Sequence, residues 1–244
     1  MVKVQARGKT SAKSTDGSYA ETPRGAGPEV DVGTPLVDSM REAGDPRTGE
    51  AVLAALAAHP NPFVRQSVAG SPVVSEAILG RLAGDPEKWV RWQVAGSPLT
   101  GGDDLARLAG DADWDVRREV GSNIWAPPGA LAELSGDHQE WTVRAAVGGN
   151  AATPEAVLDM LGGDENVQVR RAVARNPVSG AVTLARLAGD FDVSVRCAVA
   201  VNPATDPGVL KSLLYDNSPR VREVAGRCWE AWVAASRGGR PGRG

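Results

Sequence analysis

The chain has 244 residues, of which 42% are hydrophobic and only 5% aromatic, so its core must be built mainly from small aliphatic side chains. Its two cysteines and two histidines give no pattern of a disulfide framework or of paired metal ligands, and no apolar run of about 18 residues could cross a membrane. Residues 31–236 carry 19 Lys/Arg and 27 Asp/Glu, a balance of −8, which disfavours nonspecific binding to duplex nucleic acid.

The two ends of the chain differ from the part between them. Residues 1–33 are rich in Gly, Ser, Thr and Pro and show no apolar period, so we expect this segment to be disordered. It also lacks the apolar stretch of a secretory signal, and we expect a cytoplasmic location. Residues 236–244 have the same composition with three arginines, which predicts a disordered basic tail. The folded part is predicted to span residues 34–235 and to begin with a helix near 35–43.

A Val-Arg pair recurs seven times along this folded part, in steps of 26 or 27 residues. A unit this short cannot bury its own apolar face and has to stack on copies of itself. The period therefore predicts one continuous solenoid of about seven repeats. The pairs begin at Val64, Val90, Val116, Val143, Val169, Val195 and Val221.

Each repeat divides into two short helices. Val195 and Val199 stand four residues apart and so lie on one helix face. That helix must end at Asn202, because a residue before proline is pushed out of the α region. The next helix buries Leu210 and Leu213. Helices of roughly ten residues are not stable alone, so packing between repeats must stabilise them. The fold class that follows is an all-α solenoid of two-helix repeats.

An aspartate follows each leucine pair by three residues and precedes the next Val-Arg arginine by six or seven; the first unit has His59 at the aspartate position. The columns could form a charged binding stripe, a row of catalytic acids or helix caps. We favour a structural ladder that joins each repeat to the next through charge-assisted hydrogen bonds, because stacking needs many copies of one group and a site does not. The ladder residues are Asp85, Arg91, Asp111, Arg117, Asp137, Arg144, Asp164, Arg170, Asp190, Arg196, Asp216 and Arg222.

Five of the seven tryptophans lie between residues 89 and 141. On a helical wheel, Trp92, Trp114 and Trp141 point away from the valine face on three consecutive repeats. If exposed, such rings form the kind of patch that protein partners bind. The alternative is that they fold back over the preceding loop as hydrophobic staples. Trp125 lies in a nearby turn, and these four rings are the candidate partner-binding residues.

The other tryptophans are expected to pack. The wheel places Trp89 toward the interior, and Trp229 and Trp232 are expected to cap the open end of the array. Two departures from the repeat lie beside the tryptophan cluster: residues 123–128 replace the usual Asn-Pro turn, and the loop 137–142 is one residue longer than its equivalents. Function and sequence drift both produce such departures. His138 in that loop is a lone histidine, and we do not expect it to be a ligand or a base.

The recurring pattern V-R-x-x-V-A-x-N-P-x-T-x-P-x-x-L-x-x-L-A-x-D resembles the variant leucine-rich repeat, which is grouped with the HEAT and armadillo helical repeats. The resemblance covers about residues 50–228. It implies a right-handed superhelix in which one helix of each pair is often of the 3₁₀ type. Some relatives carry an iron–sulfur segment with clustered cysteines, but no cysteine precedes Cys197 here, so we expect no cofactor.

These observations predict a non-catalytic scaffold, a monomer or weak oligomer without metal, that binds a protein or peptide on one surface of the repeats. The alternative is an enzyme similar to the HEAT-like-repeat DNA glycosylases, which hold a damaged nucleotide with Trp, Asp and Arg in a concave basic cleft. That alternative requires a positively charged groove and an acid outside the ladder, such as Asp113 or Asp115. Nucleic-acid contact through the basic tails is compatible with the first hypothesis.

Overall fold

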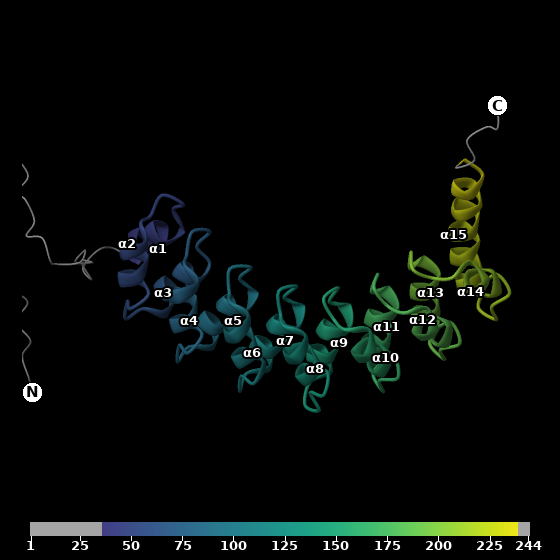
Figure 1. The fold of residues 1–244 in the computed structure, drawn as a ribbon, viewed down its shortest axis with the longest axis horizontal. Coiled ribbons are helices and arrows are strands. Elements are labelled where there is room, and N and C mark those ends of the chain that lie inside the picture. The colour runs from purple at the N-terminus through teal and green to yellow at the C-terminus, as the bar shows by residue number, and fades with distance from the viewer. Residues whose placement is uncertain (1–35, 239–244) are drawn as a thin grey trace, which may run out of the picture.

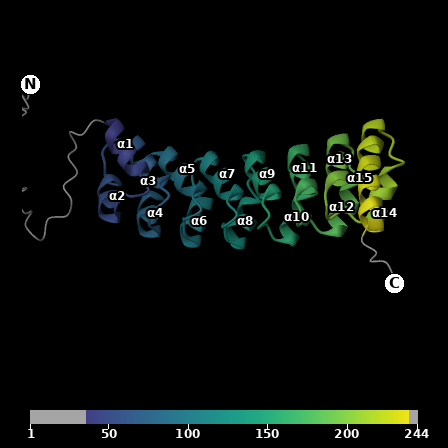
Figure 2. The same ribbon diagram turned by 90° about the horizontal axis from the view of Figure 1, so that it is seen from above.

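The structure is a computed structural model that describes residues 36–238, and these residues form 15 α-helices and no strand. The helices follow one another along a single arc, and from above they form two parallel rows (Figures 1 and 2). This arrangement confirms the predicted all-α solenoid. The opening helix is α1 (Leu36–Gly44), one residue later than predicted.

Two kinds of helix alternate along the arc. First helices carry the Val-Arg pair, and second helices carry the leucines. The first helices are α3 (Pro62–Ala69), α5 (Lys88–Gly96), α7 (Trp114–Ser122), α9 (Trp141–Gly149), α11 (Val167–Arg175), α13 (Val193–Val201) and α15 (Pro219–Gly238). The second helices are α2 (Glu50–Leu56), α4 (Glu76–Leu82), α6 (Gly102–Ala109), α8 (Pro128–Leu134), α10 (Glu155–Leu161), α12 (Ala181–Leu187) and α14 (Pro207–Leu213).

Local sequence sets where these helices begin and end. At the start of α11, the side chain of Asn166 accepts a hydrogen bond from the amide of Gln168, which satisfies an amide that has no partner inside the helix. At its end, Asn176 before Pro177 adopts extended backbone, as a residue preceding proline must. Aspartates or asparagines cap α3, α7, α13 and α14 in the same way.

The second helices are α-helical throughout the described range, although the family resemblance implies that one helix of a pair is often of the 3₁₀ type. In α4 and its C-terminal turn, Ala83 N–H donates to Leu79 O four residues back at 2.8 Å, which is α geometry. The next two amides, of Gly84 and Asp85, donate to carbonyls three residues back. A bond of the same kind, from Ile78 N–H to Ser75 O, is present at the start of α4, so the 3₁₀ character is found at the helix ends, where groups lack α-helical partners.

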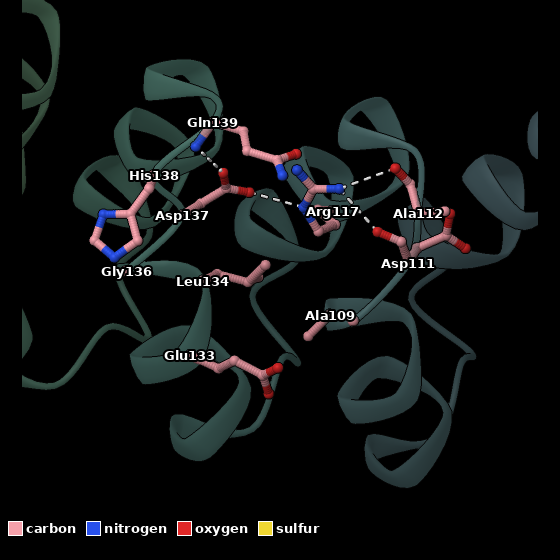
Figure 3. A pocket seen from close by; sticks show the side chains of 11 residues that line it. Ala109, Asp111, Ala112, Arg117, Glu133, Leu134, Gly136, Asp137, His138 and Gln139 are labelled. Atoms are coloured by element: carbon pink, nitrogen blue, oxygen red, sulfur yellow. Dashed lines mark hydrogen bonds and ion pairs between the residues drawn. The ribbon is translucent and has the colours of Figure 1, made fainter.

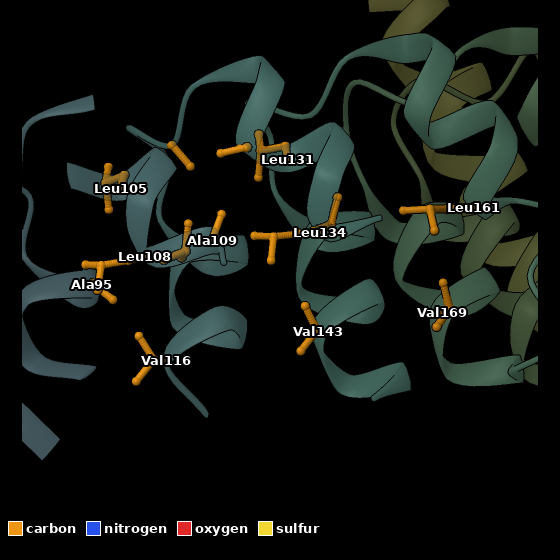
Figure 4. Close-up of a cluster of buried hydrophobic side chains, with 14 of the residues drawn as sticks. Ala95, Leu105, Leu108, Ala109, Val116, Leu131, Leu134, Val143, Leu161 and Val169 are labelled. Atoms are coloured by element: carbon orange, nitrogen blue, oxygen red, sulfur yellow. The ribbon is translucent and has the colours of Figure 1, made fainter. Parts of the chain in front are cut away.

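The core is one continuous row of side chains between the two layers of helices. Val116, Val143 and Val169 lie in a line along the first helices, and leucines such as Leu134 and Leu161 lie in a second line facing them (Figure 4). All five side chains are buried. Each repeat thus buries its apolar face against its neighbours, as the short period requires.

Small residues decide which side of the arc is concave. The fifth residue after each repeat valine is Ala or Gly, and a Cβ on Gly148 would lie only 3.1 Å from Val173 Cγ2. First helices consequently pack extensively on one another, whereas second helices, separated by leucines, make fewer contacts. Closer spacing of the first helices places them on the inner side of the arc (Figure 1).

The C-terminal end differs from the predicted boundary. Helix α15 runs to Gly238, so the first three residues of the predicted tail 236–244 are helical, and Ser236 Oγ donates to Trp232 O within that helix. The predicted segment 1–33 and the rest of the tail lie outside the described residues. Trp229 packs partly against the core and stacks on Trp232 at 5.1 Å, but Trp232 stays 43% exposed, so the end is only partly covered.

No helix within residues 36–238 combines the length and the apolar character that a bilayer span requires.

Candidate functional site

The aspartate and arginine columns meet between repeats. Arg117 Nε donates to Asp137 Oδ2 at 2.7 Å, and its Nη1 donates to the carbonyl oxygens of Asp111 and Ala112 at 2.8 and 3.2 Å (Figure 3). From Arg91 to Arg196, each ladder arginine therefore binds the carboxylate 20 residues ahead and the backbone of the acid that precedes it. At the ends, Arg65 bonds the carbonyl of His59 in place of an acid, and the predicted ladder residue Arg222 bonds, among the described residues, only backbone oxygens, those of Asp216 and Asn217. The ion pairs are Arg65–Asp85, Arg91–Asp111, Arg117–Asp137, Arg144–Asp164, Arg170–Asp190 and Arg196–Asp216.

The arginines hold several of these acids ionised. Burial alone would raise the pKa of Asp164, but hydrogen bonds from the Arg144 guanidinium and the Asn166 amide outweigh it, so the pKa lies below its usual value. For Asp85 and Asp137, hydrogen bonds from a ladder arginine and from nearby amides likewise outweigh burial and lower the pKa. For Asp216, the hydrogen bond from Arg196 is the largest cause of a lowered pKa. Such carboxylates stabilise stacking and are poor general acids at neutral pH.

The same aspartates also shape the loop that enters the next first helix. Asp164 Oδ1 accepts from the amide of Asn166, two residues on, and Asn166 is the residue that caps α11. In α7, α11 and α13, the predicted capping role therefore belongs to the residue two positions after the ladder aspartate.

A second ladder crosses the repeats at the turns after the first helices. Asn176 is buried, and its Nδ2 donates to Gly148 O and Asn150 O of the preceding repeat, both at 2.9 Å. Sequence reasoning treated these residues only as helix ends. Ser71 and Ser97 occupy the same position in earlier repeats. The asparagines that make this double bond are Asn123, Asn150, Asn176 and Asn202.

Exposed aromatic rings mark the start of four consecutive first helices. Trp114 and Trp141 are the first residues of α7 and α9 and are 38% and 41% exposed. Trp89, the second residue of α5, is 49% exposed, and Phe63 in the same register of α3 is 56% exposed. Phe63, Trp89, Trp114 and Trp141 are called the aromatic row below. Phe63 could have been found from its register with Trp89.

Two predictions about individual rings were wrong. Trp89 is exposed, not buried, and Trp92 is half-buried and packs against the core. The helical wheel assumed a single buried face, but an inner helix of a solenoid has a neighbour on each side, which leaves a narrower solvent face. Trp125 is 61% exposed, but it lies beyond the far end of α7, about 13 Å along the helix from Trp114. Trp125 therefore does not join the aromatic row.

Cations lie over two rings of the aromatic row. Lys88 Nζ lies 4.6 Å from the centre of the Trp89 ring and forms ion pairs with Asp113 at 3.0 Å and Asp115 at 3.6 Å. The hydrogen bond that Lys88 donates to Asp113 is the main reason that the pKa of Lys88 is raised. The Arg118 guanidinium lies 5.9 Å from the Trp114 ring.

A hollow of about 460 Å³ opens between α9 and α11 beside the last ring of the row. Trp141 and Gly149 line it from α9, and Arg171 and Arg175 line it from α11. The hollow exists because Ala145 and Gly149 stand where α11 carries the two arginines and α7 carries Arg118 and Ser122. It was not predicted, since small residues give no positive sequence signal.

Further hollows flank the longer loop that contains His138. One of about 450 Å³ is lined by Asp111, Arg117 and Asp137, which already bond one another, and the His138 ring points away from this ladder pair (Figure 3). Within residues 36–236, no cluster of three or more His, Cys, Asp or Glu residues has metal-binding geometry. The ladder acids thus connect adjacent repeats.

Comparisons with solved structures place the fold. The chain is similar to a leucine-rich repeat variant with a novel repetitive structural motif, at 25% identity over 78% of this chain and 80% of that one, with a TM-score of 0.55. A computationally designed armadillo repeat protein for modular peptide recognition aligns at 16% identity over 81% of this chain and 99% of that one, with a TM-score of 0.33. No protein-family model and no curated protein matches the sequence. The chain is a helical-repeat protein, as its repeats predict.

Proposed function

We propose that this helical-repeat protein is a non-catalytic scaffold that binds a protein or peptide along the inner side of its arc. The observation that carries the proposal is the aromatic row. Four successive first helices each present an aromatic ring that is more than a third exposed, although the chain has few aromatic residues. Aromatic side chains are enriched among the residues that dominate binding energy in protein interfaces, and exposed apolar patches mark such interfaces.

The variation between repeats supports the same surface. Positions at the contacts between adjacent repeats hold Val, Leu, Asp and Arg in nearly every repeat, because stacking requires the same contact each time. The first helices hold a different, partly exposed residue at each step two residues after the repeat valine, namely Trp92, Arg118, Ala145, Arg171 and Cys197. A surface whose residues change from step to step can match the sequence of one extended partner.

The glycosylase alternative depends on an acid outside the ladder. Asp113 and Asp115 were the candidates, and both form ion pairs with Lys88. Asp113 also caps α7 by accepting from the amide of Asp115. Burial tends to raise the pKa of Asp113, but Lys88 and this amide outweigh it and lower the pKa. Asp113 is therefore engaged in structure, which favours the scaffold.

A capture experiment with matched variants tests the proposal. Wild type and a Trp89/Trp114/Trp141→Ala variant are immobilised and incubated with lysate, and a Val182→Ala variant serves as the control because Val182 is an exposed residue on an outer helix. We expect a specific set of proteins with wild type and the control that is lost with the triple variant. Circular dichroism shows whether the variant is folded. A folded triple variant that captures the same proteins would contradict the proposal, and so would excision of alkylated bases by the wild type.

A further inference from the structure

We propose that the hollow between α9 and α11 binds the acidic side chains of an extended peptide through Arg171 and Arg175. This inference rests on the proposed scaffold function and specifies the chemistry of the partner. The hollow lies beside Trp141, the last ring of the aromatic row, and its two walls are formed by α9 and α11.

The two arginines lie on one face of α11. They are four residues apart, so their side chains are neighbours on the helix surface. Like charges at this spacing repel each other. None of the ion pairs formed among residues 36–236 involves either side chain, in contrast to Arg170, which is bound to Asp190. A carboxylate placed between them would relieve the repulsion and accept hydrogen bonds from both guanidinium groups.

The shape of the site suits a peptide side chain. The wall opposite the arginines is lowered because Ala145 and Gly149 stand there, so the hollow of about 460 Å³ can take a carboxylate together with part of its backbone. Trp141 lines the same hollow and is 41% exposed, which leaves its ring available to an apolar residue of the same peptide. Gln168 adds an amide that can donate to a peptide carbonyl.

The distribution of charge favours a peptide over a nucleic acid. On the neighbouring repeats, the equivalent positions are uncharged: Ala145 and Gly149 on α9, and Cys197 and Val201 on α13. A nucleic acid carries a charge at every nucleotide and needs many basic contacts along its path. One pair of arginines between uncharged neighbours instead matches a peptide that has a short acidic cluster with apolar residues on both sides.

Selection from a displayed library of random linear peptides tests this inference with the full chain as bait. The same selection is run on an Arg171→Gln/Arg175→Gln variant and on a control, Arg81→Gln/Arg107→Gln, which removes the same charge from the outer helices α4 and α6. The most enriched peptide is then synthesised, and its affinity for the three proteins is measured by fluorescence anisotropy. A version with Gln and Asn in place of Glu and Asp, and an oligothymidylate competitor, complete the set.

We expect the wild type and the control to select peptides rich in Asp and Glu. We expect the affinity of the acidic peptide to fall about tenfold or more in the Arg171/Arg175 variant and in the Gln/Asn peptide, and less than about twofold in the control. Enriched peptides without an acidic excess, or with equal affinity for all three proteins, would overturn the inference and leave the scaffold function standing. Stronger, arginine-dependent binding of oligothymidylate would overturn it in favour of a nucleic acid. No enrichment at all, together with an unchanged capture pattern for the tryptophan variant, would overturn both.

Discussion

The seam between repeats and the solvent side of the first helices are adjacent, yet they follow opposite rules. Along the seam, the ladder residues and the buried valines and leucines recur at almost every step. On the solvent side, the first helices carry residues with no common chemistry, such as Trp89 on α5, Arg118 on α7 and Arg171 on α11. Positions that recur in every repeat are those that stacking requires. Positions that vary between repeats are free of this requirement, so their chemistry can differ from one repeat to the next.

At the turns after the first helices, the seam differs between the N-terminal and the C-terminal half of the array. From Asn123 onward, a buried amide joins each repeat to the previous one with two hydrogen bonds. Ser71 stands at the equivalent position near the N-terminus, and its hydroxyl is buried without a hydrogen-bond partner among the described residues. Stacking should therefore be stronger in the C-terminal half.

The largest difference between seam and surface is expected for leucine. Leu184→Ala should lower the free energy of unfolding by about 2–5 kcal/mol, because Leu184 is fully buried in α12 and its truncation leaves a cavity. Val182→Ala in the same helix should change it by less than about 0.5 kcal/mol, since Val182 is 79% exposed. Urea unfolding followed by circular dichroism measures both. Equal losses would show that burial does not separate the two regions.

The ladder should give the next largest effect. Arg144→Met leaves the partly buried carboxylate of Asp164 without its ion pair and should cost about 2–3 kcal/mol of unfolding free energy, as expected for lost hydrogen bonds to a charged group. The matched change Arg186→Met removes an exposed ion pair with Asp159 and should cost less than about 1 kcal/mol. Thermal and urea unfolding provide the comparison, and a ladder variant as stable as the surface variant would refute the structural role of the ladder.

Exchanging residues between the two halves sharpens the difference within the seam. Asn176→Ser removes two buried hydrogen bonds and should destabilise the protein by about 1–2 kcal/mol. Ser97→Asn places an amide where it can reach the backbone of the first repeat and should raise stability by up to about 1 kcal/mol. Unfolding midpoints in urea measure the pair. Destabilisation by both changes would mean that the N-terminal turn is packed around serine.

Lowering the pH should produce the smallest effect on stability, and this effect should come from the ladder acids of the seam. Because the pKa of Asp164 and the other shifted ladder acids is lowered by folding, their contribution to stability is present above the unfolded pKa of about 3.9 and is lost as pH falls through the folded pKa. Melting temperature should therefore change little between pH 7 and 5 through these groups and should fall below about pH 4. Arg144→Met should show a weaker fall. A melting temperature that rises in acid would contradict the assignment.

The seam was largely predictable from sequence, and the surface was not. A fixed period and recurrent Val, Leu, Asp and Arg predict stacked helices, because every repeat must solve the same packing problem. The sequence did not reveal that Arg117 pairs with the acid 20 residues ahead, nor that Asn176 bonds backward, since both depend on how two repeats meet. The predicted exposures of Trp89 and Trp92 were wrong for the same reason, because a helical wheel drawn for one helix does not include the neighbouring helices.

Hydrogen exchange of the full chain with and without the acidic peptide enriched by selection tests the central claim most directly. The account predicts that the peptide slows exchange in the first helices α5, α7, α9 and α11 and leaves the second helices α4, α6, α8 and α10 unchanged, because the partner lies along the inner side of the arc. Protection confined to the second helices or to the turns near Trp125 would contradict it, and the binding surface would then lie on another face.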